Sequence, residues 1–582
     1  MFAALRSARQ QRDIEPLGVP LHWISLVAAF AFLLWENRHQ WFWVDDWSFI
    51  VDRGIRGRHL LGLWEPHNEH WSTIPILIYR GLFAVFGVRT YLPYIVLVIL
   101  LHLLTVHLLW RVMLRIGITT IVASSTCAVF AILGSGWENL TWAFQITQIG
   151  SVALGLAAVL ITPEVGAFDR RDVWVWVLLI AGLMFSGVGI TMVVVVGVIA
   201  LLRRGVKVAA LAVSAPAVAY FVWYATYGHD AARAPMQQSF TTALQAAPAF
   251  VWRGLTDAVE STAGLAGIGP VVLVLLGLWL VRRARLNRPP WPLVAAMTVG
   301  AVVFLALTDI RRSGLGIAYA GTSRYVYVVV ALLLPAATLA AVSLFDRTSV
   351  RYLVLFGVTG LLLFVQASEL NRAANRQGEL EQDAKHVILA SAELLTRREP
   401  IVTDEPAPKL PTDSTFADVA PPLQAGELAR LARDHKLPGN VTITPRDLNT
   451  ARAYLQVALT PTALVEPGPV LPALARLSGV MGEPRPGDCV RLTPVGDRPR
   501  VRFSFPTAGI LQLTSSRSGA YLAHVGTSDG RDFGDGSPLE FPGGRERIMS
   551  VSARDVAVEL QIPPVGVTTV CGMQTIEPQV LM

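Results

Sequence analysis

The sequence has too few charged residues for a soluble protein of its length. Only 16% of its 582 residues are charged, whereas 53% are hydrophobic and the mean hydropathy is +0.48. Soluble domains carry about 25% charged residues. This composition excludes a large soluble globular protein and indicates a polytopic membrane protein.

Cysteine and lysine are also scarce. The three cysteines exclude a disulfide-dense scaffold. Cys127 lies in an apolar run, where a buried thiol is expected, while Cys489 and Cys571 lie in the polar C-terminal region and would pair there in an oxidising compartment. Only four of the 49 basic residues are lysines, so arginine carries the net charge of +7.

Long apolar runs take the place of the missing charges. The hydrocarbon core of a bilayer is roughly 30 Å thick and needs about 20 apolar residues per helix. No small-residue cleavage site follows the first run, so we expect it to be retained as a span. The sequence predicts about eleven spans, near residues 20–36, 91–112, 117–134, 148–163, 173–188, 190–203, 207–227, 267–284, 290–308, 325–344 and 350–367.

The distribution of arginine predicts the orientation of these spans. Cytoplasmic loops carry the excess of arginine and lysine, and alternate loops of this chain are basic. We expect an inner-membrane protein with a cytoplasmic N-terminus and with the region after residue 368 outside. The basic loops contain Arg111, Arg115, Arg170, Arg171, Arg203, Arg204, Lys207, Arg282 and Arg283.

Arginines also occur in three segments that this topology places outside. Snorkelling at the membrane interface explains a single arginine of this kind. A group of them suits an anionic ligand, because a guanidinium matches phosphate oxygens with two hydrogen bonds. The group comprises Arg53, Arg56, Arg58, Arg80 and Arg89 in the first loop, Arg233 and Arg253 in residues 228–266, and Arg311, Arg312 and Arg324 before the tenth span.

The first external loop, residues 37–89, contains adjacent acids in an aromatic setting. Asp45 and Asp46 lie in the stretch "FWVDDWSF", just after the first span. A carboxylate among apolar rings can serve as a general base, and its neighbour can bind a cation or orient a hydroxyl. The alternative is that one acid caps the following helix, which leaves the second acid without a role.

The same loop contains "HNEHW", which comprises His67, Asn68, Glu69, His70 and Trp71. We expect His67, Glu69, His70 and Trp71 to bind substrate or to order the loop. The spacing differs from His-Glu-x-x-His, so a divalent cation (Mg or Mn) held by Asp46, His67 and His70 is the weaker alternative. In the next external segment Glu138 lies between two tryptophans, a pattern that suits sugar rings and also suits interfacial anchoring.

These residues resemble a known family. The acids Asp45 and Asp46 after the first span, the "HNEHW" run and the "TSRYVYV" run at residues 322–328 look like those of the GT-C class of integral-membrane glycosyltransferases. The likeness covers residues 20–368. It implies transfer of a sugar from a polyprenyl-phosphate donor to a glycan, lipid or protein acceptor outside the membrane, with Asp45 or Asp46 as the base.

The resemblance also gives the late external residues a role. It implies that Arg311, Arg312 and Arg324, together with Tyr325, bind the donor and its phosphate. No nucleotide-binding glycine pattern occurs on the predicted cytoplasmic side, which favours a lipid-linked donor over a nucleotide sugar. No feature indicates a nucleic-acid partner.

The C-terminal third has a different pattern. We expect a connecting helix, a Pro-rich linker and short helices over residues 369–480. Short alternating runs broken by Gly, Pro and Asp then predict an extracytoplasmic β-sandwich over residues 481–582. The predicted fold class is therefore a polytopic α-helical, GT-C-like membrane domain, residues 1–368, followed by a mainly β domain.

Two other classes of function compete with transfer. A lipid-linked glycan flippase or exporter would also need many spans, but it should place ionisable residues near the bilayer centre. The spans are almost without such residues, apart from His102 and His107. A non-catalytic cell-envelope scaffold would tolerate changes at Asp45 and Asp46 and would depend on residues 480–582.

Overall fold

The computed structural model describes residues 15–57, 61–229, 240–286, 290–343, 348–411 and 416–574. The chain divides into two units. The helical unit comprises residues 1–40, 57–82 and 91–379, and the C-terminal unit comprises residues 41–56, 83–90 and 380–582. Two stretches of the first loop, residues 37–89, thus belong with the C-terminal region, which the sequence did not predict. Arg58, Arg233 and the N-terminal residues 1–14 lie outside the described residues.

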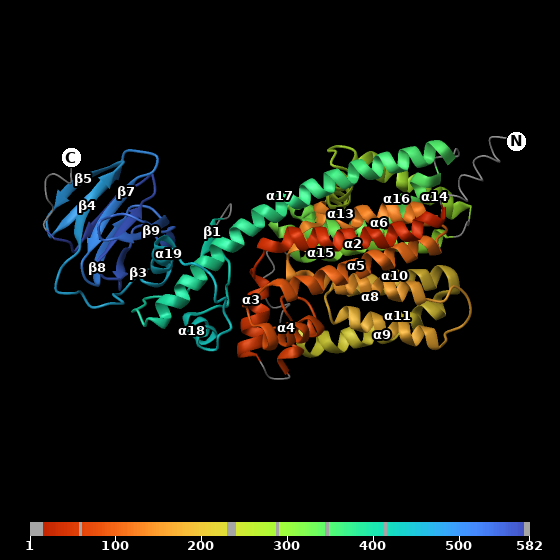
Figure 1. The fold of residues 1–582 in the computed structure, drawn as a ribbon, viewed down its shortest axis with the longest axis horizontal. Coiled ribbons are helices and arrows are strands. Elements are labelled where there is room, and N and C mark those ends of the chain that lie inside the picture. The colour runs from red at the N-terminus through yellow and green to blue at the C-terminus, as the bar shows by residue number, and fades with distance from the viewer. Residues whose placement is uncertain are drawn as a thin grey trace. The chain divides into compact units, whose positions relative to one another are not determined.

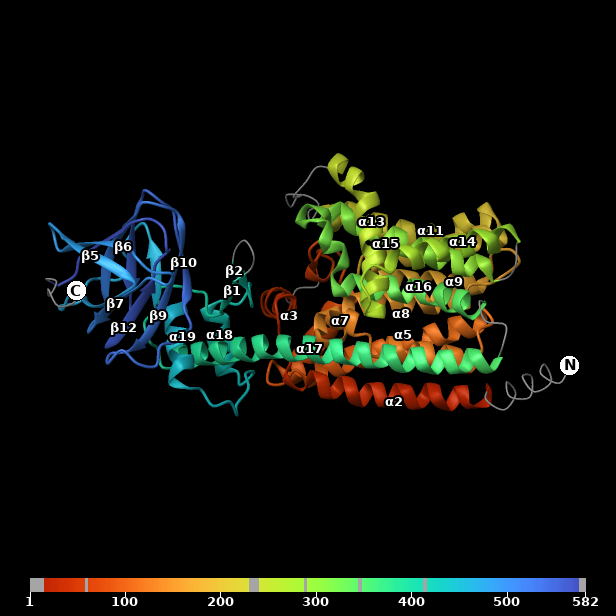
Figure 2. The ribbon, with the colours of Figure 1, turned by 90° about the horizontal axis from the view of Figure 1, so that it is seen from above.

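Long apolar helices make up the helical unit, and they lie side by side in Figures 1 and 2. Helix α2 packs on α6, α5 packs on α8, and α10 packs on both α11 and α15. The helices are α2 (Gly18–Glu36), α4 (Thr73–Phe86), α5 (Leu92–Arg115), α6 (Thr120–Ala131), α7 (Trp137–Thr141), α8 (Ile146–Ile161), α9 (Arg170–Leu183), α10 (Val188–Arg204), α11 (Val206–Trp223), α13 (Phe240–Ala263), α14 (Gly269–Arg285), α15 (Trp291–Arg312), α16 (Ser323–Ser343) and α17 (Thr348–Thr396).

Seven helical segments of the described chain are long and apolar enough to cross a membrane, and a bent pair, α6 with residues 134–141, raises this number to eight. This finding supports a multi-pass membrane protein. All eleven predicted spans overlap a helix of the structure. However, α9 has only 14 residues, and α10 and α14 have 17 each. The seven segments are Glu15–His39, Leu92–Arg115, Ala143–Ile161, Val206–Gly228, Trp291–Leu315, Ser323–Ser343 and Tyr352–Thr396.

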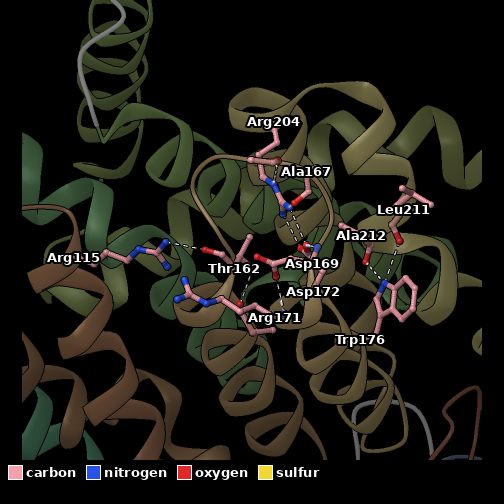
Figure 3. Close-up of polar contacts among 12 residues, drawn as sticks. Arg115, Thr162, Ala167, Asp169, Arg171, Asp172, Trp176, Arg204, Leu211 and Ala212 are labelled. Atoms are coloured by element: carbon pink, nitrogen blue, oxygen red, sulfur yellow. Dashed lines mark hydrogen bonds and ion pairs between the residues drawn. The ribbon is translucent and has the colours of Figure 1, made fainter.

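Buried charges fix the turn between α8 and α9 (Figure 3). Asp172 in the first turn of α9 accepts two hydrogen bonds from Arg204, at 2.6 and 2.8 Å, and both side chains are 1% exposed or less. Asp169 caps the helix by accepting the backbone N–H of Arg171. Arg115 donates to the carbonyl of Thr162 at the end of α8. Removing one partner of such a buried pair would leave an uncompensated charge.

A proline inside α11 leaves one backbone carbonyl without its helical hydrogen bond, and a side chain in this region replaces that bond. Pro216 has no N–H with which to bond the carbonyl four residues earlier. That carbonyl, on Ala212, instead accepts the indole N–H of Trp176 at 3.0 Å, as Figure 3 shows. Trp176 in α9 therefore satisfies a backbone group that the proline leaves without its helical partner.

Before its β domain, the C-terminal unit contains helices and a short two-stranded sheet. It contains α3 (Asp45–Ile50) and the π-helical turn η3 (Val51–Arg56) from the first loop, the end of α17, α18 (Ala425–Arg433) and α19 (Pro445–Leu455). Strands β1 (Lys409–Pro411) and β2 (Phe416–Asp418) pair antiparallel. Arg56 of η3 binds Glu427 of α18 at 3.0 Å, and the backbone N–H of Trp41 donates to the Glu381 carboxylate.

The C-terminal part of the chain forms two antiparallel sheets (Figures 1 and 2). Their inner faces share one core, to which Phe503 and Phe505 contribute from one sheet and Leu511 and Leu513 from the other. The five-stranded sheet has the order β10-β9-β12-β7-β4 and the six-stranded sheet the order β3-β11-β8-β13-β6-β5. The strands are β3 (Val457–Thr460), β4 (Ala473–Ser478), β5 (Val480–Arg485), β6 (Cys489–Pro494), β7 (Arg500–Phe505), β8 (Gly509–Ser515), β9 (Gly519–Thr527), β10 (Ser537–Phe541), β11 (Glu546–Val551), β12 (Val556–Gln561) and β13 (Thr568–Cys571).

This β domain begins earlier than residue 481. Strands β3 and β4 precede the predicted boundary, because residues 457–460 and 473–478 have too few alternating apolar residues to stand out in the sequence. A disulfide joins Cys489 of β6 to Cys571 of β13, the pairing that the sequence predicts. The two cysteines lie directly opposite one another in the register of these strands.

Candidate functional site

Three segments that the sequence places outside the membrane meet at one end of the helical unit. Glu69 of the first loop accepts a hydrogen bond from Arg312 at the end of α15, at 2.6 Å. Glu138 of the second segment lies 3.5 Å from Arg324 in the first turn of α16. These contacts connect residues that are 243 and 186 positions apart in the chain.

Glu138 also orders the start of α16. One carboxylate oxygen accepts the Ser323 hydroxyl at 2.6 Å and the backbone N–H of Arg324 at 3.1 Å. The first N–H groups of a helix have no partner within the helix and carry partial positive charge. The Glu138 carboxylate therefore stabilises this helix end and orients the Arg324 side chain at the same time.

Tyrosines connect the two ion pairs. The Tyr325 hydroxyl interacts electrostatically with the side chains of both Arg312 and Arg324. Arg324 also donates to the Tyr319 hydroxyl at 2.5 Å, and its guanidinium lies 5.4 and 5.7 Å from the Tyr325 and Tyr319 ring centroids. Cation–π contacts of this kind contribute about 0.5–1 kcal/mol at exposed sites. The arginines are thus held in defined positions.

The electrostatic environment keeps Glu69 charged. Burial favours the neutral acid, but the charges of His70 and Arg312 outweigh that effect and lower the pKa of Glu69 below its usual range. The His70 ring nitrogen lies 3.8 Å from the Glu69 carboxylate. The first loop therefore presents a carboxylate anion to Arg312 at neutral pH.

Arg311 gives the group its excess of positive charge. It directly precedes Arg312 in the last turn of α15 and makes no ion pair within the described part of the chain. We call Glu69, Glu138, Arg311, Arg312, Arg324 and Tyr325 the loop cluster. Three arginines against two carboxylates, 3 − 2, leave it with a net charge of +1.

The two histidines of "HNEHW" lie at the ends of a tight turn. The backbone N–H and C=O groups of His67 and His70 bond one another at 3.0 and 2.9 Å, and Asn68 between them has φ +51°. His67 is buried 5.3 Å from the Phe144 ring. His70 lies so close to Gly187 that a Cβ there would be 2.9 Å from its Nδ1. Both side chains order the loop that presents Glu69.

Trp71 packs inside the helical unit. Its ring stacks on Trp223 of α11, with centroids 5.4 Å apart, and its indole N–H donates to Thr73. As for metal ions, the described residues contain no group of three or more His, Cys, Asp or Glu side chains that could hold one. The weaker alternative of a cation on Asp46, His67 and His70 thus has no ligand set among these residues.

The acidic pair lies in the C-terminal unit, where its members differ. Asp46 is fully buried, and its carboxylate accepts the backbone N–H of Trp43 at 3.0 Å. Asp45 is half-buried at the start of α3. Between Trp43 and Asp45, Val44 has φ +39°, which is a strained conformation for a β-branched residue, and its N–H donates to Val419 at 2.8 Å. Asp46 supports this turn, and such strain is frequent at functional sites.

The sequence interpretation missed Asp309, which lies one helical turn before Arg312. It is completely buried, and its two carboxylate oxygens have no hydrogen-bond partner in the described ranges. The Ser313 hydroxyl donates to the backbone carbonyl of Asp309 at 2.8 Å. Its position at the end of an apolar run made it look like an ordinary loop residue. Tyr319 and Ser323 were also missed, since only the fold places them beside Arg324 and Glu138.

No protein-family model, curated protein sequence or solved structure matches this chain.

Proposed function

We propose that the protein is a membrane glycosyltransferase of the GT-C type that uses a polyprenyl-phosphate sugar as donor. The observation that carries the proposal is the loop cluster, which holds Arg312 and Arg324 in place at one end of a set of apolar helices, with Arg311 directly before Arg312. A lipid-borne phosphate needs charge-assisted hydrogen-bond donors at the level where its apolar chain enters the membrane. Ordinary connecting loops do not supply them.

The donor phosphate is assigned to the arginines. Arg312 and Arg324 each use part of their five N–H donors on a carboxylate or a tyrosine, so further donors remain for phosphate oxygens. Arg311 adds the uncompensated charge. Eleven spans, with the short helices α9, α10 and α14 among them, would place this end of the unit outside an inner membrane, together with the C-terminal domain. The acceptor is a glycan, lipid or protein.

The general base is assigned to Asp45. Asp46 is fully buried, whereas Asp45 is half-buried and is therefore the acid with the better access to an acceptor. In the transfer, Asp45 takes the proton of the acceptor hydroxyl and the oxygen attacks the anomeric carbon. The bond from that carbon to the phosphate oxygen breaks, and the polyprenyl phosphate leaves with the bonding electron pair. Arginine stabilises the charge that develops on this leaving group.

The test measures consumption of a panel of polyprenyl-phosphate sugars by the purified protein, with and without chelator. Asp45→Asn is expected to lower the rate about 10²–10⁴-fold, the usual contribution of a general base. Asp52→Asn is the matched control, because Asp52 is an exposed acid of the same loop that pairs with Arg56. Equal rates for the folded Asp45→Asn variant and the wild type would contradict the proposal.

The same preparation distinguishes the other two classes of function. An exporter would move the lipid-linked sugar across a vesicle membrane without consuming it. A scaffold would do neither and would tolerate both aspartate changes. A deletion that tests the scaffold should remove residues 457–582, because a cut at residue 480 would leave β3 and β4 without their sheets.

A further inference from the structure

One row of charged side chains crosses the outer face of the five-stranded sheet. In the strand register, Arg476 of β4 lies opposite Arg502 of β7, Arg502 lies opposite Glu559 of β12, and Glu559 lies opposite His524 of β9. Directly opposite residues of antiparallel strands share one face of a sheet. This face therefore carries two arginines side by side at its edge.

A hollow lies over the arginine end of this row. Its volume is about 190 Å³, and it is lined by Arg476, Ser478, Arg500, Arg502 and Glu559. We call these five residues the sheet pocket. Glu559 is 11% exposed and accepts one hydrogen bond from Arg500, at 2.9 Å, and one from Arg502, at 3.0 Å. Both guanidinium groups retain further N–H donors.

Arg502 is fixed in place before any ligand binds. The Phe533 ring lies 4.6 Å from its guanidinium carbon, and the Gly530 carbonyl accepts from its Nη1 at 3.4 Å. Gly530 has φ +75°, and a Cβ at this position would come within 2.6 Å of the guanidinium. The loop between β9 and β10 thus needs glycine here in order to approach Arg502. An arginine held in this way loses little side-chain entropy on binding.

The charges of the sheet pocket are not balanced. The sheet pocket contains three arginines and one glutamate, so its net charge is 3 − 1, or +2. Two exposed ion pairs of the β domain, Arg485 with Glu483 and Arg531 with Asp529, have one acid for each arginine. Arg476 makes no ion pair with any residue that the structure describes. Like charges directly opposite one another destabilise a sheet, so the pair Arg476 and Arg502 has a cost that a purely structural role does not explain.

Two buried side-chain nitrogen atoms of this row of charged residues also lack hydrogen-bond partners among the described residues. The Nε of Arg502 and the Nε2 of His524 are buried without a hydrogen-bond partner among the described residues. Leaving a buried polar group without a hydrogen-bond partner destabilises the folded state. A structural salt-bridge network would be expected to satisfy the Arg502 donor. An anion with several oxygens would instead accept from the arginines and cancel their repulsion.

We propose that the sheet pocket binds a phosphate monoester group. Such a group carries about −1.5 to −2 charges at pH 7 and three acceptor oxygens, which match the net charge of +2 and the arginine donors. A single carboxylate would compensate only half of that charge. The phosphate can belong to a soluble or polymer-borne phosphate ester or to a lipid headgroup, and both present the same oxyanion. The proposal is independent of the glycosyltransferase assignment, because it concerns a separate set of arginines.

The test titrates the full-length protein in dodecyl maltoside with inorganic phosphate and follows binding by calorimetry. Arg324→Gln is the background, so that phosphate binding at the loop cluster does not obscure the result. Arg476→Gln combined with Arg500→Gln is expected to raise the Kd at least tenfold. Arg485→Gln combined with Arg531→Gln is the matched control, since it removes the same two charges from exposed pairs of the same domain, and its Kd should stay within twofold.

Each result of this titration is decisive. No binding by the background protein, or an equal loss in the double variant and the control, would overturn the proposal. Donor consumption by the double variant in an otherwise wild-type chain should be unchanged, which separates this test from that of the proposed function. Displacement of the bound phosphate by methyl phosphate identifies a soluble ester as the source. Displacement only by phosphatidic acid in the micelles identifies a lipid headgroup, and displacement by neither contradicts the site.

Discussion

The loop cluster and the sheet pocket both gather three arginines, but they pair them differently. In the loop cluster Arg312 and Arg324 each have a carboxylate, Glu69 and Glu138, at 2.6 and 3.5 Å. In the sheet pocket two arginines share Glu559, and Arg476 has no acid within the described ranges. The carboxylates of the first group come from separate loops, whereas the sheet register alone places the charges of the second.

This difference separates two uses of arginine. Carboxylates that each orient one guanidinium create a precise but nearly neutral arrangement, which is suited to stabilising charge that develops during a reaction. An excess of positive charge on a rigid sheet is suited to holding a ligand that is already charged. Changing one residue of an ion pair in the loop cluster should therefore affect the rate of transfer. Changing one in the sheet pocket should affect the binding of phosphate.

The largest effect is expected from Arg324→Gln in the loop cluster. It removes a donor to the leaving phosphate and leaves Glu138, which is 15% exposed, without its ion pair. By comparison with the loss of one oxyanion donor, kcat/KM for the lipid donor should fall about 10²–10³-fold. Combining it with Glu138→Gln should restore thermal stability but not activity. Full activity of the single variant would place the donor phosphate elsewhere.

A smaller effect is expected from Glu559→Gln in the sheet pocket. Loss of the shared carboxylate leaves three like charges together and should lower the free energy of unfolding of the β domain by roughly 1–3 kcal/mol. Added phosphate should recover part of this loss, since a ligand that binds only the folded state stabilises it. Thermal unfolding with and without phosphate measures both the loss of stability and its recovery. Glu483→Gln, which breaks an exposed pair, is the control that should show neither.

The smallest effect is expected in the pH dependence of the stability that the ion pair between Glu69 and Arg312 contributes. Because the folded-state pKa of Glu69 is depressed, its contribution to stability is present above the usual glutamate pKa. The contribution is lost as the pH falls through the depressed value. Glu69→Gln should therefore be less stable than the wild type at neutral pH, by at most about 1 kcal/mol, and the two should converge in acid. A difference that stays constant down to strongly acidic pH would show that the charge of Glu69 is not its source.

Much of the architecture follows from composition, while the contacts within the site do not. Apolar runs predict where helices occur, and the arginine distribution singled out Arg312 and Arg324. Pairing Glu138 with Arg324 requires the fold, since nothing local connects residues that lie so far apart in sequence. The separate roles of Asp45 and Asp46 also depend on burial, which adjacent identical residues cannot reveal. Asp309 was missed because an acid at the end of an apolar run normally faces water.

The first-loop acids depend on the C-terminal half of the chain for their support. Val44 bonds to Val419, Trp41 to Glu381, and Arg56 to Glu427, so the stretch 41–56 has its hydrogen-bond partners more than 300 positions further along. In evolution these two stretches would have to be inherited together. A recombinant chimera that exchanged the membrane helices but kept the native C-terminal half would need to retain residues 41–56 as well.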